Sequence, residues 1–155
     1  MGNSQSVGEN RFVPYEDKPL DAGTACPVST THVANAYRAP IYVACITDLL
    51  ELKRTKYQLK KAVVEGDIQR LENSGFSKID PKQVFPFQRP VPSDRRCSVY
   101  VSVVVVDRKK LKLAAWAFVL KPDQGVIVNR RCELRKAKRG MRWIDEKGKD
   151  HLSRE

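Results

Sequence analysis

The alternation of apolar and polar residues is clearest between residues 97 and 134, where it predicts β-strands. In residues 97–106 the β-branched residues dominate, and alternate positions from Cys97 to Val105 share one face. Residues 111–120 and 126–134 predict two more strands, and residues 135–143 are expected to fold back as a fourth, with Gly140 in the turn. Residues 107–110 have the length of a tight turn. In 121–125, Pro122 favours a type I turn that leaves Gly125 in the left-handed conformation. Connections this short favour an antiparallel meander.

A helical spacing of apolar residues precedes these strands. Asp48 as N-cap and Glu51 three residues later predict a capping box, and Gly66 is expected to end the helix after Val64. Its apolar face comprises Cys45, Leu49, Leu52, Leu59 and Val63. Packing on the sheet is favoured over lying on a membrane, because a sheet needs one face covered. Residues 67–73 predict a second short helix.

Two segments have less regular patterns. Residues 41–46 are apolar and fit either a short strand or the entry to the helix. Residues 81–93 hold four prolines and predict an extended connector, in which Phe85 and Phe87 anchor to the core.

Together these elements predict an α+β fold, an antiparallel β-meander of three to five strands packed with one or two helices and preceded by a flexible N-terminal arm. The 155-residue length fits one domain, expected at 39–146. Residues 1–38 are expected to form the arm, and 147–155 a mobile charged tail.

Positive charge is concentrated on the predicted sheet. The chain has a net charge of +11, and residues 130–142 hold seven basic residues against one acidic residue, Glu133. The candidate residues for binding an anion are Arg108, Lys109, Lys110, Arg130, Arg131, Arg135, Lys136, Lys138, Arg139 and Arg142. A solvated rim that protects strand edges is the simpler interpretation. Such density also creates a field of several kT, which favours anionic membrane lipids or nucleic acid as partners.

The first six residues, MGNSQS, match the N-myristoylation pattern M-G-x-x-x-[ST]. Removal of Met1 exposes the α-amine of Gly2, which is the expected lipidation site, and Ser6 is the favoured small hydroxyl residue. The side chains of the arm up to about residue 31 sum to −2, so the positive charge that would cooperate with an acyl chain must come from the folded domain.

A myristoylation motif at Gly2–Ser6 joined to a strongly basic domain resembles an N-myristoylated viral matrix protein. The resemblance implies a structural protein that lines the inner leaflet, self-associates as a homo-oligomer and bridges to a nucleoprotein. The β-rich pattern departs from the helical retroviral matrix domains, which leaves a matrix protein from another virus group open. The expected locations are the cytosol, the cytoplasmic face of a membrane and the virion.

The sequence holds no phosphate loop, paired-carboxylate site or nucleophile elbow, so a non-enzymatic binding or structural role is expected. Cys26, Cys45, Cys97 and Cys132 are widely spaced without a C-x-x-C pair, which argues against a zinc site. No metal or cofactor is expected apart from covalent myristate. The alternative function is nucleic-acid binding, with the 130–142 hairpin on phosphates and Trp143 stacked on a base.

Overall fold

A computed structural model describes residues 28–91 and 97–137 of the chain. In chain order the elements are β1 (Val28–Asn35), β2 (Ile41–Ile46), α1 (Leu49–Glu65), α2 (Ile68–Asn73), β3 (Ser77–Ile79), β4 (Val84–Pro90), β5 (Val99–Asp107), β6 (Lys110–Leu120), β7 (Gly125–Val128) and β8 (Leu134–Ala137). The segment 41–46, which the sequence left open, is therefore a strand.

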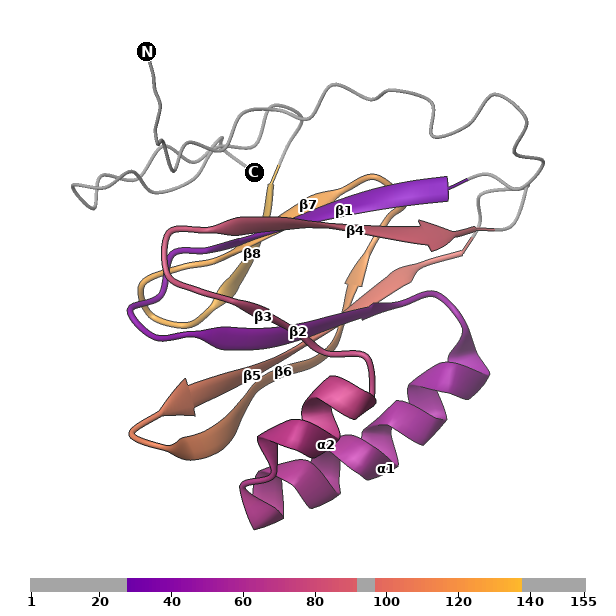
Figure 1. The fold of residues 1–155 in the computed structure, drawn as a ribbon. Coiled ribbons are helices and arrows are strands. Elements are labelled where there is room, and N and C mark those ends of the chain that lie inside the picture. Colours follow the sequence, from indigo (N-terminus) through magenta and orange to yellow (C-terminus); the bar gives the residue numbers. More distant parts are fainter. Residues whose placement is uncertain (1–27, 92–96, 138–155) are drawn as a thin grey trace.

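The strands form two four-stranded sheets that lie face to face (Figure 1). One sheet has the order β4-β1-β7-β8 and the other β3-β2-β5-β6. Every pairing is antiparallel except that of β1 with β7. The predicted α+β class, with antiparallel strands and two helices, is confirmed. The strands do not follow one continuous meander, because β7 leaves the β5–β6 hairpin and joins the opposite sheet.

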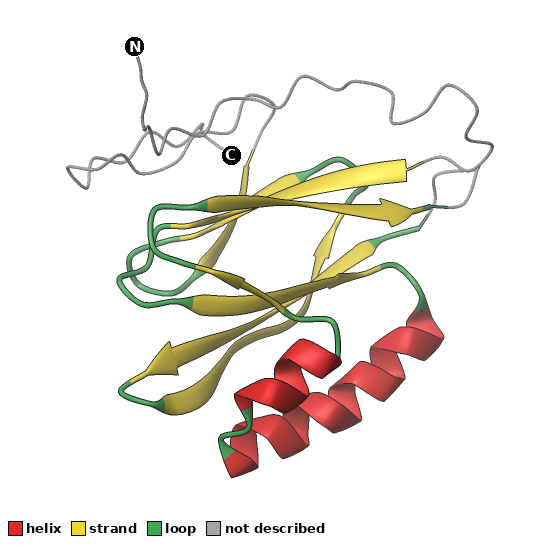
Figure 2. Ribbon diagram, viewed as in Figure 1, coloured by secondary structure: helices red, strands yellow, loops and turns green. Residues whose placement is uncertain are grey.

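The main core fills the space between the sheets. The predicted inward face of β5 is confirmed, since Val99, Val101, Val103 and Val105 all pack into this core. They meet Val33, Phe87, Val126 and Val128 from the opposite sheet. The helices cover the other face of the β3-β2-β5-β6 sheet (Figure 2), where Leu59, Leu71 and Phe76 close a second core.

Helix α1 begins and ends where the sequence predicts. The Asp48 carboxylate accepts a hydrogen bond from the backbone N–H of Leu50 at 3.0 Å. Gly66 adopts a left-handed φ of 67° and its N–H donates to the Ala62 carbonyl. The buried stripe is shifted from the predicted one: Thr55, Leu59 and Ala62 are buried, whereas Leu49 is exposed.

Three strands, β1, β3 and β4, lie where the sequence predicts none. β1 occupies residues assigned to the arm and pairs on both sides, so the expected domain boundary at residue 39 is wrong. Its alternate buried residues are Ser29, Thr31 and Val33, and the polarity of the first two hid the strand from the hydrophobic pattern. The expected connector instead contains β4, an edge strand, where prolines are tolerated. Two phenylalanines were expected to pack into the core. Phe87 is buried there, whereas Phe85 is 38% exposed.

The turn after β6 is confirmed at residues 121–124, with Pro122 as its second residue. The left-handed residue is Asp123, with φ of 65°, rather than Gly125. This is a type II-like arrangement. The backbone N–H of Asp123 donates to Ser29 Oγ, and its carboxylate accepts from the backbone N–H of Thr30. The turn is therefore tied to β1 and directs the chain into the second sheet. The predicted arm before residue 28 and the tail at 147–155 lie outside the described residues.

Candidate anion-binding site

The strand pairings bring four loops to one end of the sandwich. β1 and β7 run parallel, so the loops that follow them, 36–40 and 129–133, leave the first sheet on the same side. In the second sheet Ile41 pairs with Val105 and with Ile79, which places the turn at 107–110 and the loop at 80–83 at that end too. All four loops lie at the left of Figure 1. We call these four loops the basic end.

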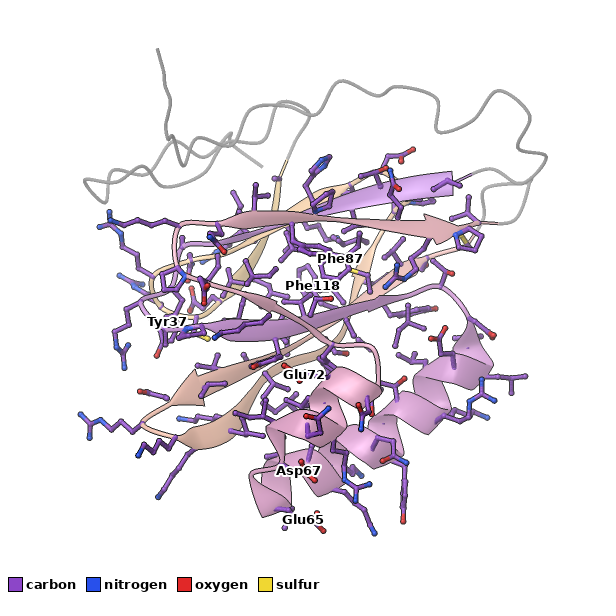
Figure 3. All side chains as sticks on the ribbon, in the orientation of Figure 1. Tyr37, Glu65, Asp67, Glu72, Phe87 and Phe118 are labelled. Carbon is purple, nitrogen blue, oxygen red and sulfur yellow. The ribbon has the colours of Figure 1, made fainter. Side chains whose placement is uncertain are left out.

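The basic end carries more basic than acidic side chains. Its seven basic residues are Arg38, Lys82, Arg108, Lys109, Lys110, Arg130 and Arg131. Its three acidic residues are Asp80, Asp107 and Glu133. Nitrogen-tipped side chains project from this end around Tyr37 (Figure 3). The turn at 108–110 and the loop at 130–131 belong to opposite sheets and are thus brought to one end of the sandwich.

Each acidic residue of the basic end has a cationic partner. Asp107, at the end of β5, pairs with Arg38 of the 36–40 loop at 3.1 Å. Glu133 pairs with Arg135 at 3.3 Å, and Asp80 pairs with Lys78 at 3.8 Å. Five exposed cations of the loops make no ion pair within the described residues: Arg108, Lys109, Lys110, Arg130 and Arg131. Their charge is available to an anion from outside.

The β5–β6 turn holds two of these cations in a costly backbone conformation. Asp107 pairs with Lys110, so Arg108 and Lys109 form a two-residue loop. Their φ angles are 53° and 66°, as a type I′ turn requires. Asn and Gly are the residues favoured there, because a side chain with a large Cβ substituent is strained in the left-handed region. Strain of this kind persists where the surroundings hold it, and it is concentrated at functional sites.

The β7–β8 loop is organised by Asn129. Its side-chain oxygen accepts the backbone N–H groups of Arg131 and Glu133, each at 2.9 Å. Cys132 lies in this loop with a left-handed φ of 63°. Burial raises the pKa of the Cys132 thiol against the lowering effect of Lys112 and Arg38. Cys132 therefore stays uncharged at neutral pH and does not reduce the positive charge of the loop.

Asn35 holds the loops together from beneath. This residue is 1% exposed, and its side-chain nitrogen donates to the carbonyls of Ala39 and Ile79 at 3.0 Å. Its side-chain oxygen accepts from the backbone N–H of Tyr37 at 2.9 Å. The backbone N–H of Ala36 also donates to the Val128 carbonyl at 2.7 Å. The positions of the loops are thus fixed by buried hydrogen bonds rather than by the charged side chains.

The described part of the predicted 130–142 hairpin differs from the expectation. The chain reverses at 129–133, so Arg130 and Arg131 lie in the turn while Arg135 and Lys136 lie on β8. Gly140, the expected turn residue, lies outside the described residues. Lys136 lies outside the basic end, and its ammonium group is 6.0 Å from the centre of the Phe118 ring. The predicted residues Gly2, Lys138, Arg139 and Arg142 lie outside the described residues.

Sequence reasoning missed Arg38 and Lys82 as members of this surface. Both stand alone in their loops, so charge density along the chain does not mark them. Only the pairing of β1 with both β4 and β7 brings their loops to the others.

Other kinds of site have little support in the part of the chain that is described. Residues 28–91 and 97–137 contain no group of three or more metal-ligating side chains. Within the same residues, no helix has the length and hydropathy to cross a bilayer. Comparisons with protein-family models, with curated proteins and with solved structures each found no match, so no family is assigned.

Proposed function

We propose that this protein is a peripheral membrane-binding structural protein that docks its basic end on anionic lipid headgroups. A myristoyl group on Gly2 would supply a second anchor. The observation that carries the proposal is the gathering of Arg108, Lys109, Lys110, Arg130 and Arg131 on one surface without acidic partners.

The energies of the two anchors are complementary. A single myristoyl chain binds a bilayer with K of about 10⁴ M⁻¹, which gives only reversible contact. Each Lys or Arg close to an anionic leaflet contributes about 1 kcal/mol. If all five unpaired cations reach the surface, they add up to about 5 kcal/mol, enough to strengthen binding by roughly three to four orders of magnitude at low salt.

The two anchors are able to reach one membrane. β1 begins at the end of the sandwich opposite the basic end, and its eight residues span roughly 27 Å. The chain between Gly2 and Val28 is long enough to extend at most about 90 Å. The acyl group therefore has enough chain to reach the bilayer on which the basic end docks.

Lipid is favoured over nucleic acid because the basic end lacks a stacking surface among its described residues. Its only aromatic side chain is Tyr37, which is buried, with the Arg38 guanidinium 4.8 Å above the ring. Proteins that bind single strands combine charge with exposed aromatic rings. Trp143, the expected stacking residue, lies outside the described residues. Nucleic-acid binding is the alternative function, and the RNA titration described below distinguishes it from lipid binding.

Self-association at the inner leaflet belongs to the same proposal, as does a matrix-like role in a virion. β6 is an eleven-residue strand at the edge of its sheet, and a strand of this kind offers backbone groups to a second copy. Analytical ultracentrifugation with and without anionic vesicles tests this part. Sedimentation as a monomer under both conditions would remove it.

The docking experiment uses co-sedimentation with vesicles that contain phosphatidylserine and with neutral vesicles. Replacing Arg108, Lys109, Arg130 and Arg131 with Gln is expected to weaken binding to the anionic vesicles and to leave neutral vesicles unaffected. The matched control removes four cations from α1: Lys53, Arg54, Lys60 and Lys61. An equal loss in the control would mean that net charge, rather than the basic end, drives binding.

A parallel titration with single-stranded RNA separates the two functions. Strong RNA binding that is lost in the basic-end variant, together with unchanged vesicle binding, would assign the basic end to nucleic acid. The intact mass of the protein from its native cell tests the lipid anchor. Retention of an unmodified Gly2 would remove myristate from the proposal.

A further inference from the structure

A second surface feature is an apolar groove between α1 and β6, on the helix-covered side of the second sheet. Its volume is about 280 Å³. Leu59, Val63 and Val64 line it from the helix, and Leu113 and Trp116 line it from the strand. Val64 is 85% exposed and Leu113 is 46% exposed, so the groove opens to solvent over apolar side chains. It is distinct from the basic end and does not depend on the function proposed above.

The mouth of the groove is positively charged. Lys56 and Lys60 are its remaining lining residues, and their spacing of four puts both on one side of α1. Neither lysine makes an ion pair within the described residues. A lysine stem lies along apolar surface while its ammonium group stays outside. The groove thus has an apolar floor and two cations at its rim.

The strand side of the groove is shaped by an irregularity in β6. The pairing of β5 with β6 shifts register between Val101 and Val103 and again before Val104. Within this irregularity Ala117 has a left-handed φ of 53°, and its N–H donates to the buried Ser102 hydroxyl at 3.0 Å. Trp116 is packed on the helix side, while Phe118 points into the main core. Bulges of this kind redirect a side chain, and here the redirected side chain lines the groove.

We propose that the α1–β6 groove binds one free medium-chain fatty acid, with the hydrocarbon chain on the apolar floor and the carboxylate between Lys56 and Lys60. A methylene group is close in size to a water molecule, whose share of the liquid is roughly 30 Å³, so the groove has room for about nine carbons. This space suits one chain rather than the two chains of a phospholipid. The two lysines favour a free carboxylate over an amide-linked acyl group, which carries no charge.

The test uses the full chain produced without acylation and decanoate as the probe, measured by isothermal titration calorimetry. Decanoate is expected to bind with one-to-one stoichiometry and at least tenfold tighter than decanol, its uncharged counterpart. Lys56→Gln/Lys60→Gln should reduce decanoate affinity to that of decanol and leave decanol unaffected. Lys53→Gln/Lys61→Gln removes the same charge from the same helix outside the groove and should change neither ligand.

The apolar floor is tested separately. Leu113→Asp and Val64→Asp change exposed positions, so both variants are expected to fold, and each should weaken decanoate and decanol at least tenfold. With Trp143→Phe, Trp116 is the sole tryptophan, and a brominated decanoate should quench its fluorescence with the same affinity as calorimetry gives. Saturable binding with Trp116 quenching supports the site.

Three results would overturn the proposal. The first is the absence of saturable decanoate binding. The second is an equal effect of the two lysine pairs, which would indicate non-specific charge. The third is unchanged affinity in both aspartate variants, which would place the ligand elsewhere. If the unacylated chain binds decanoate but the acylated chain does not, the groove belongs to the chain's own acyl group, and the free fatty acid is ruled out as its occupant.

Discussion

Replacing Arg108-Lys109 with Asn-Gly is expected to make the protein more stable and a weaker binder of anionic membranes. The two residues form the I′-like turn between β5 and β6 with φ angles of 53° and 66°. A residue other than Gly in the left-handed region costs about 1–2 kcal/mol. Gly relieves this strain but loses about 0.5–1 kcal/mol through the entropy of the unfolded chain, and Asn tolerates the conformation well. The net gain is therefore about 1 kcal/mol, or roughly 2–4 °C in Tm for a chain of this size.

The same change removes two cations from the basic end. At about 1 kcal/mol for each charge near an anionic leaflet, the loss is about 2 kcal/mol, or roughly 30-fold in affinity at low salt. Urea unfolding followed by tryptophan fluorescence gives the stability, and vesicle co-sedimentation gives the affinity.

Arg108→Gln/Lys109→Gln is the matched control because it removes the same charges and keeps side chains in the strained turn. It should lose as much affinity as Asn-Gly without the gain in stability. The reasoning is refuted if Asn-Gly is no more stable than Gln-Gln, since strain would then be absent. It is also refuted if both variants bind anionic vesicles as the wild type does.

Three further outcomes are expected. Asn35→Ala leaves several buried backbone groups without partners and should lower the free energy of unfolding, measured by urea denaturation, by about 3 kcal/mol. A loss below about 1 kcal/mol would mean that the Asn35 side chain is not needed to hold the loops in place. Deleting residues 1–39 should abolish the cooperative thermal transition because β1 is lost, whereas deleting 1–26 should preserve it; a cooperative melt of the shorter chain would contradict the central place of β1. Burial raises the pKa of the Cys45 thiol from its ordinary value near 9 to about 12. The unfolded chain therefore releases this proton first, and stability should fall by about 1.4 kcal/mol per pH unit as pH rises from about 9 toward 12, with no contribution below 9. Cys45→Ala should show a shallower decline over that range in pH-dependent urea unfolding, and equal slopes would remove the thiol as its cause.

Local signals in the sequence predicted local structure well. Asp48 and Gly66 bracket α1 because capping depends on residues within one turn of the helix. The inward face of β5 follows from the alternation of its valines. β1 escaped prediction because the residues that it buries include Ser29, Thr31 and Asn35, whose burial depends on partners distant in sequence.

The candidate site shows the same limit. Charge density along the chain identified Arg108 and Arg130 as candidates, but it did not show that their turns belong to opposite sheets. The register that joins them depends on the parallel pairing of Val33 with Val126, which no local pattern encodes. Arg38 is the single cation of its loop, and only the structure shows its contact with Asp107 at the end of β5.

The parallel pairing of β1 with β7 also sets an order of events during synthesis. The strands β2 to β6 find their partners within the stretch from residue 28 to 120, and β1 pairs with β4 in that time. β7 is made more than ninety residues after the strand on which it docks. Until then the first sheet has two strands, and its apolar inner side is incomplete. Such long-range closure is slow relative to hairpin formation. A nascent chain is thus expected to acquire the complete basic end only after β7 and β8 are made, so the docking proposed above would reach its full strength only then.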